Sequence, residues 1–245
     1  MNNMKAIVLA AGKGTRMQTS DNDAPKVMRE VCGKPLLSYV LDALSFISSK
    51  DTIIVVGYMK ELVIDYFSEY VFAEQIEQLG TGHAVLSAKK EISDFTGSVL
   101  VCCGDMPAVK RSTYETLARE HFISGNDCTI LTGESSIQLP YGRIIRDTNN
   151  DFVCVVEERD CSPDQLAITE LNSGVYVFKA QSLYEAIDSL KRDNSQSEYY
   201  LTDVPAIMID NGRSVGICKM NLGDEIIGVN TLQQLVMVEG IFQKR

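Results

Sequence analysis

Hydrophobic residues in the first half of the chain form short continuous runs that alternate with segments of helical spacing. Apolar and largely β-branched runs predict buried strands at residues 5–10, 52–56, 70–73 and 98–103. Apolar positions three and four residues apart predict helices at residues 35–47, 62–66, 84–89 and 112–124. Strands that alternate with helices form βαβ units, so the pattern predicts a mostly parallel sheet.

The second half of the chain is richer in strand-like runs. Strands are predicted at residues 127–132, 143–146, 152–156, 174–178 and 214–220, and helices at 182–190, 203–209 and 231–243. The polar stretch 147–151 is typical of a hairpin turn. No long linker or internal repeat divides the sequence, so we expect one α/β domain over residues 1–245.

The distribution of charge narrows the possible partners. The net charge of −10 disfavours binding to nucleic acid, but residues 1–35 carry six basic and three acidic side chains, a local charge of +3. A small basic region on an acidic protein suits a compact polyanion such as a triphosphate, although ordinary surface scatter would give the same count. No apolar run is long enough to span a membrane. Seven cysteines without a C-x-x-C pair disfavour a disulfide framework or a structural zinc site, and we expect a cytoplasmic protein.

A glycine-rich loop follows the first predicted strand and reads Leu-Ala-Ala-Gly-Lys-Gly-Thr-Arg-Met over residues 9–17. It fits neither the Walker loop nor the dinucleotide-binding fingerprint. Glycines let backbone N–H groups approach anionic oxygens, and the cations Arg16 and Lys26 lie nearby in sequence. The alternative is a simple turn between strand and helix with solvated basic side chains.

This loop, together with Pro25-Lys26 and the run Gly-Lys-Pro-Leu at 33–36, resembles the signature of the nucleotidylyltransferase superfamily. The closest resemblance is to the uridylyltransferase domain of bacterial N-acetylglucosamine-1-phosphate uridylyltransferases. It implies a Rossmann-like mixed sheet flanked by helices, with a nucleotide-binding half at about 1–110, a sugar-binding half at about 111–230 and a C-terminal helix at 231–245. It also implies that Arg16 and Lys26 contact phosphates as catalytic residues. The nucleotide-binding positions of the loop would be Leu9, Ala10, Ala11, Gly12 and Gly14.

Further positions match the resemblance on the nucleotide side. Gln75 precedes a Gln-Leu-Gly-Thr-Gly-His-Ala run at 78–84, and a glutamine amide can donate to and accept from a base edge. The resemblance implies that Gln75, Gly80 and Thr81 read uracil, whereas the sequence alone also allows Thr81 to be a helix cap. Gly104, at the end of the strand run 98–103, is expected beside the nucleotide.

Two oxygen-bearing side chains are candidates for a metal site. Asp105 follows a strand, where a carboxylate points into the crevice used by α/β proteins, and it suits Mg²⁺. Asn230 stands where the last helix should begin. Each residue could instead cap a turn or helix. The resemblance implies that both hold the catalytic Mg²⁺.

The sugar-binding positions rest on the resemblance, because each residue alone could belong to a turn or the surface. They are Gly142, Glu157, Asn172, Tyr200 and Thr202. The implied reaction takes UTP and N-acetylglucosamine 1-phosphate to UDP-N-acetylglucosamine and pyrophosphate, without nucleic acid or membrane. The sequence lacks the hexapeptide repeats of the acetyltransferase part, so we expect no acetylation of glucosamine 1-phosphate. Alternatives are another sugar phosphate or nucleotide, as in a cytidylyltransferase, or a non-catalytic nucleotide-sugar sensor.

Overall fold

A nine-stranded sheet forms the centre of the protein. The computed structural model describes residues 3–14, 17, 24–135 and 139–244, and within these residues seven strands follow the order β11-β7-β10-β6-β1-β4-β5. β8 pairs with β10, and β9 pairs with β8. The strands are β1 (Met4–Leu9), β4 (Thr52–Val56), β5 (Val71–Glu74), β6 (Ser98–Cys103), β7 (Cys128–Glu134), β8 (Arg143–Arg146), β9 (Phe152–Val156), β10 (Glu170–Lys179) and β11 (Val215–Met220).

The direction of the strands decides what meets at each end of the sheet. β1 runs parallel to β4 and β6, β4 runs parallel to β5, and β11 runs parallel to β7. β10 is antiparallel to both of its neighbours, β6 and β7. The amino end of β10 therefore lies at the sheet edge where the carboxyl ends of β6 and β1 emerge. This arrangement confirms the predicted Rossmann-like, mixed and mostly parallel sheet.

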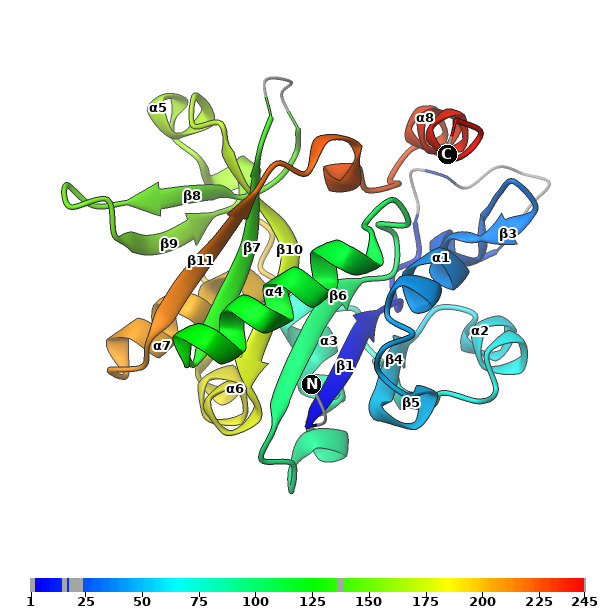
Figure 1. Ribbon diagram of the computed structural model, residues 1–245, viewed down its shortest axis with the longest axis horizontal. Helices are drawn as coiled ribbons and strands as arrows, with labels where there is room; N and C mark the ends of the chain where they lie inside the picture. Colours follow the sequence, from blue (N-terminus) through cyan, green and yellow to red (C-terminus); the bar gives the residue numbers. More distant parts are fainter. Residues whose placement is uncertain (1–2, 15–16, 18–23, 136–138, 245) are drawn as a thin grey trace.

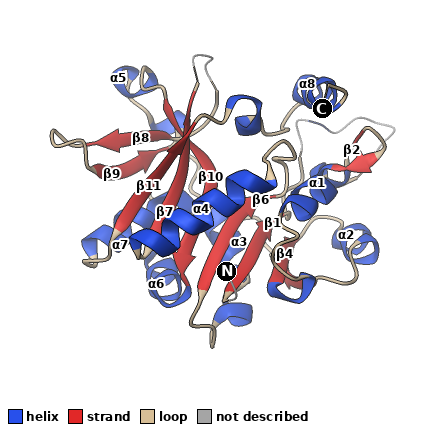
Figure 2. Ribbon diagram, viewed as in Figure 1, coloured by secondary structure: helices blue, strands red, loops and turns tan. Residues whose placement is uncertain are grey.

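Helices cover both faces of the sheet (Figures 1 and 2). They are α1 (Leu36–Ala43), α2 (Lys60–Tyr66), α3 (Thr81–Ser87), α4 (Arg111–Ser124), α5 (Pro163–Leu166), α6 (Ala180–Ala186), α7 (Val204–Asp210) and α8 (Leu232–Phe242). Alternate residues of a strand enter different hydrophobic clusters, as in β1, where Ala6 and Val8 pack with α1 and Ile7 packs with α3. Because both faces are covered, the strands read as continuous apolar runs.

Most predicted elements are confirmed, with ends displaced by a few residues. Among the described strands and α-helices, two short features were not predicted. One is the hairpin of β2 (Glu30–Val31) and β3 (Lys34–Pro35), whose turn residues Cys32 and Gly33 both have positive φ. The other is α5, which begins with a capping box between Ser162 and Gln165.

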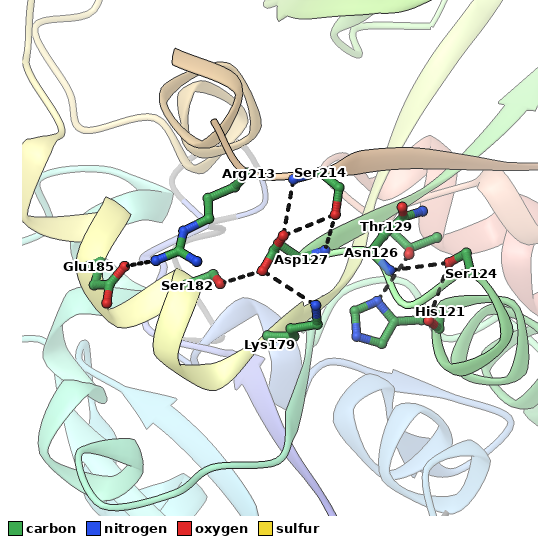
Figure 3. A network of polar contacts seen from close by, with 10 residues as sticks. All are labelled: His121, Ser124, Asn126, Asp127, Thr129, Lys179, Ser182, Glu185, Arg213 and Ser214. Atoms are coloured by element: carbon green, nitrogen blue, oxygen red, sulfur yellow. Dashed lines mark hydrogen bonds and ion pairs between the residues drawn. The ribbon is translucent and has the colours of Figure 1, made fainter. Parts of the chain in front are cut away.

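A polar network fastens the sheet at the end opposite to the predicted ligand edge (Figure 3). Asp127, just before β7, accepts hydrogen bonds from the backbone N–H and hydroxyl of Ser214 and from the hydroxyl of Ser182, and it pairs with Lys179. Burial alone would raise the pKa of Asp127, but the hydrogen bonds from Ser182 and Ser214 lower it to about 2. The network joins the starts of β7 and β11 to the end of β10.

Candidate active site

The strands β1 and β6 bring the glycine loop and Asp105 to the same edge of the sheet. Leu9 is in register with Cys103, and the N–H of Gly104 donates to the carbonyl of Leu9 at 2.9 Å. The N–H of Ala10 donates to the carbonyl of Val55 at 2.9 Å. The chain leaving β1 therefore runs directly beside the chain leaving β6, as in the ligand crevice of parallel sheets.

A cavity of about 250 Å³ opens at this edge. Seven of the predicted nucleotide-binding residues line it: Leu9, Ala10, Ala11, Gly12, Gln75, Gly80 and Thr81. Lys26 and Asp105 line it as well. A Cβ added at Gly12 would meet nothing within 4 Å, so the loop presents bare backbone to open space. Arg16, the other predicted phosphate contact, lies outside the described residues.

Two predicted nucleotide-binding glycines support the cavity wall and are not among the described residues that line it. Gly14 has φ +61°, and a Cβ there would lie 2.6 Å from Cβ of Lys26. A Cβ at Gly104 would lie 3.1 Å from a methyl group of Leu37 and 3.2 Å from the carbonyl oxygen of Leu9. Both glycines permit close packing directly behind the site.

Gln75 is held at one end of this cavity by hydrogen bonds. Its side chain is only 4% exposed, and its amide nitrogen donates to the carbonyl of Gly80 at 3.0 Å and lies 3.1 Å from Nδ1 of His83. Gly80 has φ +109°, and a Cβ there would lie 2.6 Å from the carbonyl oxygen of Tyr199. The amide is thus preorganised beside the cavity, as recognition of a base edge requires.

Thr81 does not cap the helix, contrary to the alternative suggested by the sequence. The N-cap residue of α3 is Gly80, and Thr81 is the first residue of the helix. The hydroxyl of Thr81 instead accepts a hydrogen bond from the N–H of Leu201 at 3.1 Å. The local sequence suggested that this hydroxyl caps the helix, but it bonds instead to a residue 120 positions later in the sequence.

Asp105 and Asn230 converge on one positively charged group. The ammonium of Lys26 forms an ion pair with Oδ2 of Asp105 and donates to Oδ1 of Asn230 at 2.8 Å. The N–H of Val229 donates to the carbonyl of Asp105 at 2.9 Å, which keeps the two segments together. Asn230 is not the helix cap, because Thr231 caps α8 by accepting from the N–H of Gln234 at 3.2 Å.

This donor set fits Mg²⁺. A carboxylate oxygen and an amide oxygen are hard ligands, and Mg²⁺ commonly takes one or two protein ligands while substrate phosphates and water supply the rest. Both oxygens already face a cation, the Lys26 ammonium. Within the described residues, no group of three or more His, Cys, Asp or Glu side chains is arranged to hold a metal.

A second cavity, of about 150 Å³, adjoins the first across Leu9, Thr81, Cys103 and Asp105. Four predicted sugar-binding residues line it: Gly142, Glu157, Asn172 and Thr202. Asn230 also lines it, so the candidate metal ligands stand where the two cavities meet. A ligand with two parts, such as a nucleotide joined to a sugar, could occupy both cavities at once.

Glu157 is the only carboxylate apart from Asp105 among the described residues that line this second cavity. The hydroxyl of Thr202 donates to Oε1 of Glu157 at 3.0 Å. Burial raises the pKa of Glu157, and the nearby carboxylates of Asp203 and Asp160 act in the same direction, whereas the hydrogen bond from Thr202 opposes them. The second oxygen of the carboxylate can accept a hydroxyl from a bound sugar.

Tyr200, a predicted sugar-binding residue, takes a different position. It is not among the described residues that line the second cavity, and its side chain is buried. Its hydroxyl accepts from Gln196 at 2.8 Å and donates to Asp160 at 3.2 Å. In this structure Tyr200 braces the loop behind Glu157 and Thr202.

Residues 199–202 connect the two cavities. Tyr199 exchanges backbone hydrogen bonds of 2.8 Å with Leu79 and Gly82 on the side of the first cavity. Leu201 donates to Thr81, and Thr202 reaches Glu157 on the other side. We call this stretch the bridging segment.

Several cavity residues were not predicted. Cys103 and Tyr176 are strand residues: Cys103 is the last residue of β6, and Tyr176 lies on β10 opposite Val101. Tyr141 accepts a hydrogen bond from the N–H of Gly228 at 2.8 Å, and Glu198 lines the first cavity. The position of Tyr141 directly before Gly142 was a signal that sequence reasoning could have used.

The chain is similar to known proteins over nearly its whole length. The chain is 41% identical over 244 residues to the bifunctional protein GlmU of Clostridioides difficile (strain 630), and 40% identical over 243 residues to that of Pelotomaculum thermopropionicum. Each match covers 99% of this chain and 52% of the relative, so the chain spans about half the length of these proteins. A crystal structure of UDP-glucose pyrophosphorylase complexed with UDP-glucose shares the fold, with a TM-score of 0.76, 17% identity and 98% coverage of both chains.

The sequence profile of one family covers most of the chain. Residues 6–202, which include both β1 and the bridging segment, match the family described as MobA-like NTP transferase domain. This chain belongs to the MobA-like NTP transferase family.

Proposed function

We propose that this chain transfers a uridylyl group from UTP to N-acetylglucosamine 1-phosphate, releasing pyrophosphate and forming UDP-N-acetylglucosamine. The observation that carries the proposal is the junction of two cavities at Asp105 and Asn230. The first cavity is lined by the backbone of Ala10–Gly12 together with Lys26, Gln75 and Asp105. The second is lined by the polar residues Glu157, Asn172 and Thr202 among apolar side chains. The similarity to the GlmU proteins over 99% of the chain supports this choice of substrates.

The residues would act mainly by positioning. UTP would lie in the first cavity with its base against Gln75 and Gly80 and its phosphates along Ala10–Gly12. The sugar would lie in the second cavity, with hydroxyl or amide groups bound by Glu157 and Asn172. Its phosphate oxygen would then face the α-phosphorus in line with the departing pyrophosphate, which is the geometry that phosphoryl-type transfer needs.

The negative charge of the phosphates would be neutralised where the two cavities meet. Asp105 and Asn230 would hold Mg²⁺, which supplies orientation and electrostatic stabilisation of phosphate oxygens when bound. Lys26 would stabilise the negative charge that develops on the phosphates, and we assign the same role to Arg16 on the basis of the sequence resemblance. The proposed mechanism requires no covalent intermediate on a side chain.

The cellular compartment of the reaction is inferred from the helices and the cysteines. In the described part of the chain, no helix combines the length and apolar character needed to cross a membrane. All seven cysteines are described and are free thiols. Free thiols are usual in a reducing compartment, so we propose that the reaction takes place in the cytoplasm and involves neither membrane nor nucleic acid.

A pyrophosphate-release screen tests the proposal directly. UTP, CTP, ATP and GTP would each be combined with N-acetylglucosamine 1-phosphate, glucosamine 1-phosphate, glucose 1-phosphate and N-acetylgalactosamine 1-phosphate. We expect the highest kcat/KM for UTP with N-acetylglucosamine 1-phosphate. Release with a different pair would assign another substrate, and release with none would favour a nucleotide-sugar sensor.

Substitution of Asp105 tests the residue assignment. Asp105→Ala should lower kcat by about 10³-fold or more, because a preorganised electrostatic site at the reacting phosphates is often the largest contribution to catalysis. Asp42→Ala removes a carboxylate from an exposed ion pair with Lys34 and is the matched control. A circular dichroism spectrum should show that both variants fold, and near-normal turnover by Asp105→Ala would contradict the assignment.

A further inference from the structure

The ammonium of Lys26 occupies the position between the two candidate metal ligands. It pairs with Oδ2 of Asp105 and donates to Oδ1 of Asn230 at 2.8 Å, and these are the oxygens that the proposed function assigns to Mg²⁺. The side chains of Lys26 and Asp105 are only 16% and 15% exposed. Two cations cannot share these oxygen atoms at such close range without strong repulsion.

The residues around Lys26 orient its side chain toward Asp105 and Asn230. Gly14 packs so closely on the lysine that an added Cβ would lie 2.6 Å from its Cβ. Pro25 precedes a 3₁₀ turn in which the carbonyl of Lys26 accepts from the N–H of Arg29 at 3.1 Å. The backbone bond from Val229 to Asp105 holds the two oxygen donors together. Three separate segments thus build the contact.

We propose that Lys26 is an internal counter-ion that holds the metal position until the metal arrives with the nucleotide. A mostly buried carboxylate without a cation is unfavourable, and the ammonium of Lys26 compensates the charge of Asp105 in the metal-free protein. Lysine suits this role because its flexible stem lets a compact charge move away when the metal takes the oxygens. Triphosphate oxygens in the adjoining cavity would then receive the displaced ammonium. This inference rests on the proposed function for its metal site.

The consequence is that free divalent cation binds weakly to the protein alone. Nucleotide and metal should bind cooperatively, because the nucleotide offers the displaced ammonium a new anionic partner. A lysine that only contacts phosphate would leave the affinity for free metal unchanged when it is replaced.

Binding of Mn²⁺ in the absence of substrates tests the inference. Electron paramagnetic resonance of free Mn²⁺ would give the dissociation constant for wild type, Lys26→Met, Lys26→Arg and Lys34→Met. We expect Lys26→Met to bind Mn²⁺ about tenfold more tightly, since one partly screened like charge is removed from the site. Lys34→Met, which removes a surface charge paired with Asp42, should match wild type, and so should Lys26→Arg. Equal affinities of wild type and Lys26→Met would overturn the inference.

A second measurement uses the wild-type protein and does not depend on the folding of a variant. Lysine acylation followed by mass spectrometry should show Lys26 protected in metal-free protein and more reactive at a Mg²⁺ concentration that saturates the weak site for free metal, with Lys34 unchanged. Unchanged reactivity of Lys26 would overturn the inference. Because neither assay contains UTP or a sugar phosphate, its outcome is separate from that of the pyrophosphate-release screen.

Discussion

His121 provides a test of how burial affects stability at acidic pH. The residue lies in the last turn of α4 and is only 2% exposed, and its Nδ1 lies 3.0 Å from the hydroxyl of Thr129 (Figure 3). Burial lowers the pKa of His121 from 6.5 to about 4, and Lys179 acts in the same direction while Asp127 opposes it. Between about pH 6.5 and pH 4, His121 is therefore mostly neutral in the folded protein but mostly protonated in the unfolded chain.

The sign and size of the effect follow from linkage. Well above pH 6.5 His121 is neutral in both states and does not change the free energy of unfolding, and as the pH falls the unfolded state gains a proton first. The free energy of unfolding should fall by about 1 kcal/mol at pH 6 and about 2 kcal/mol at pH 5 because of His121 alone. The decrease in the free energy of unfolding should level off at about 3 kcal/mol below pH 4.

The assay compares wild type with His121→Gln, which keeps a hydrogen-bonding group near Thr129 but does not titrate. Urea unfolding followed by far-ultraviolet circular dichroism suits a chain that contains no tryptophan. Measurements would run from pH 7.5 to 4.5, and the difference between the two profiles removes the contributions of the carboxylates. Asp127, with its pKa of about 2, contributes stability that is lost mainly below this range. Parallel pH profiles for the two proteins would refute the reasoning.

Two further predictions concern single residues of the site. Gly80→Ala should destabilise the fold by about 1–3 kcal/mol, because the backbone has φ +109° and the new methyl group would meet the carbonyl of Tyr199. The control Gly240→Ala, on a helix where the methyl group meets open space, should not destabilise it. Urea midpoints of the two variants would check this, and equal midpoints would contradict the clash. Glu157→Gln should raise the KM for N-acetylglucosamine 1-phosphate about tenfold and leave that for UTP unchanged, because a charged acceptor in the second cavity is lost. Steady-state kinetics with Glu158→Gln as control would test this, and an equal rise in the KM for UTP would speak against the assigned cavity.

The sequence predicted the fold well because local signals and tertiary structure agree. The strand runs at 5–10 and 98–103 are apolar because both faces of the sheet are covered, and their carboxyl ends carry the loop glycines and Asp105. The hairpin turn at Cys32 and Gly33 was missed because it lacks the usual Asn-Gly pair, although both residues adopt the required positive φ. The Ser-Pro-Asp-Gln start of α5 was a readable capping signal.

The details of the site depended on contacts that sequence does not encode locally. The antiparallel direction of β10, which brings Asn172 and Tyr176 to the ligand edge, cannot be read from a strand pattern. The hydroxyl of Thr81 and the side chain of Asn230 could both have capped helices, and only long-range partners decided otherwise. The contacts of the Tyr200 hydroxyl with Asp160 and Gln196 were likewise not readable from the local sequence, and its place at the sugar stays a prediction.

The bridging segment constrains how this protein can diversify. Four consecutive residues, 199–202, form hydrogen bonds with residues 79–82 at the proposed base site and with Glu157 at the proposed sugar site. A mutation that reshapes the first cavity to admit a new base would therefore shift the wall of the second cavity. A change of nucleotide specificity should thus weaken binding of the sugar phosphate. We expect variants selected for a different nucleotide to need compensating changes around Glu157 and Asp160 before they regain full turnover on the original sugar.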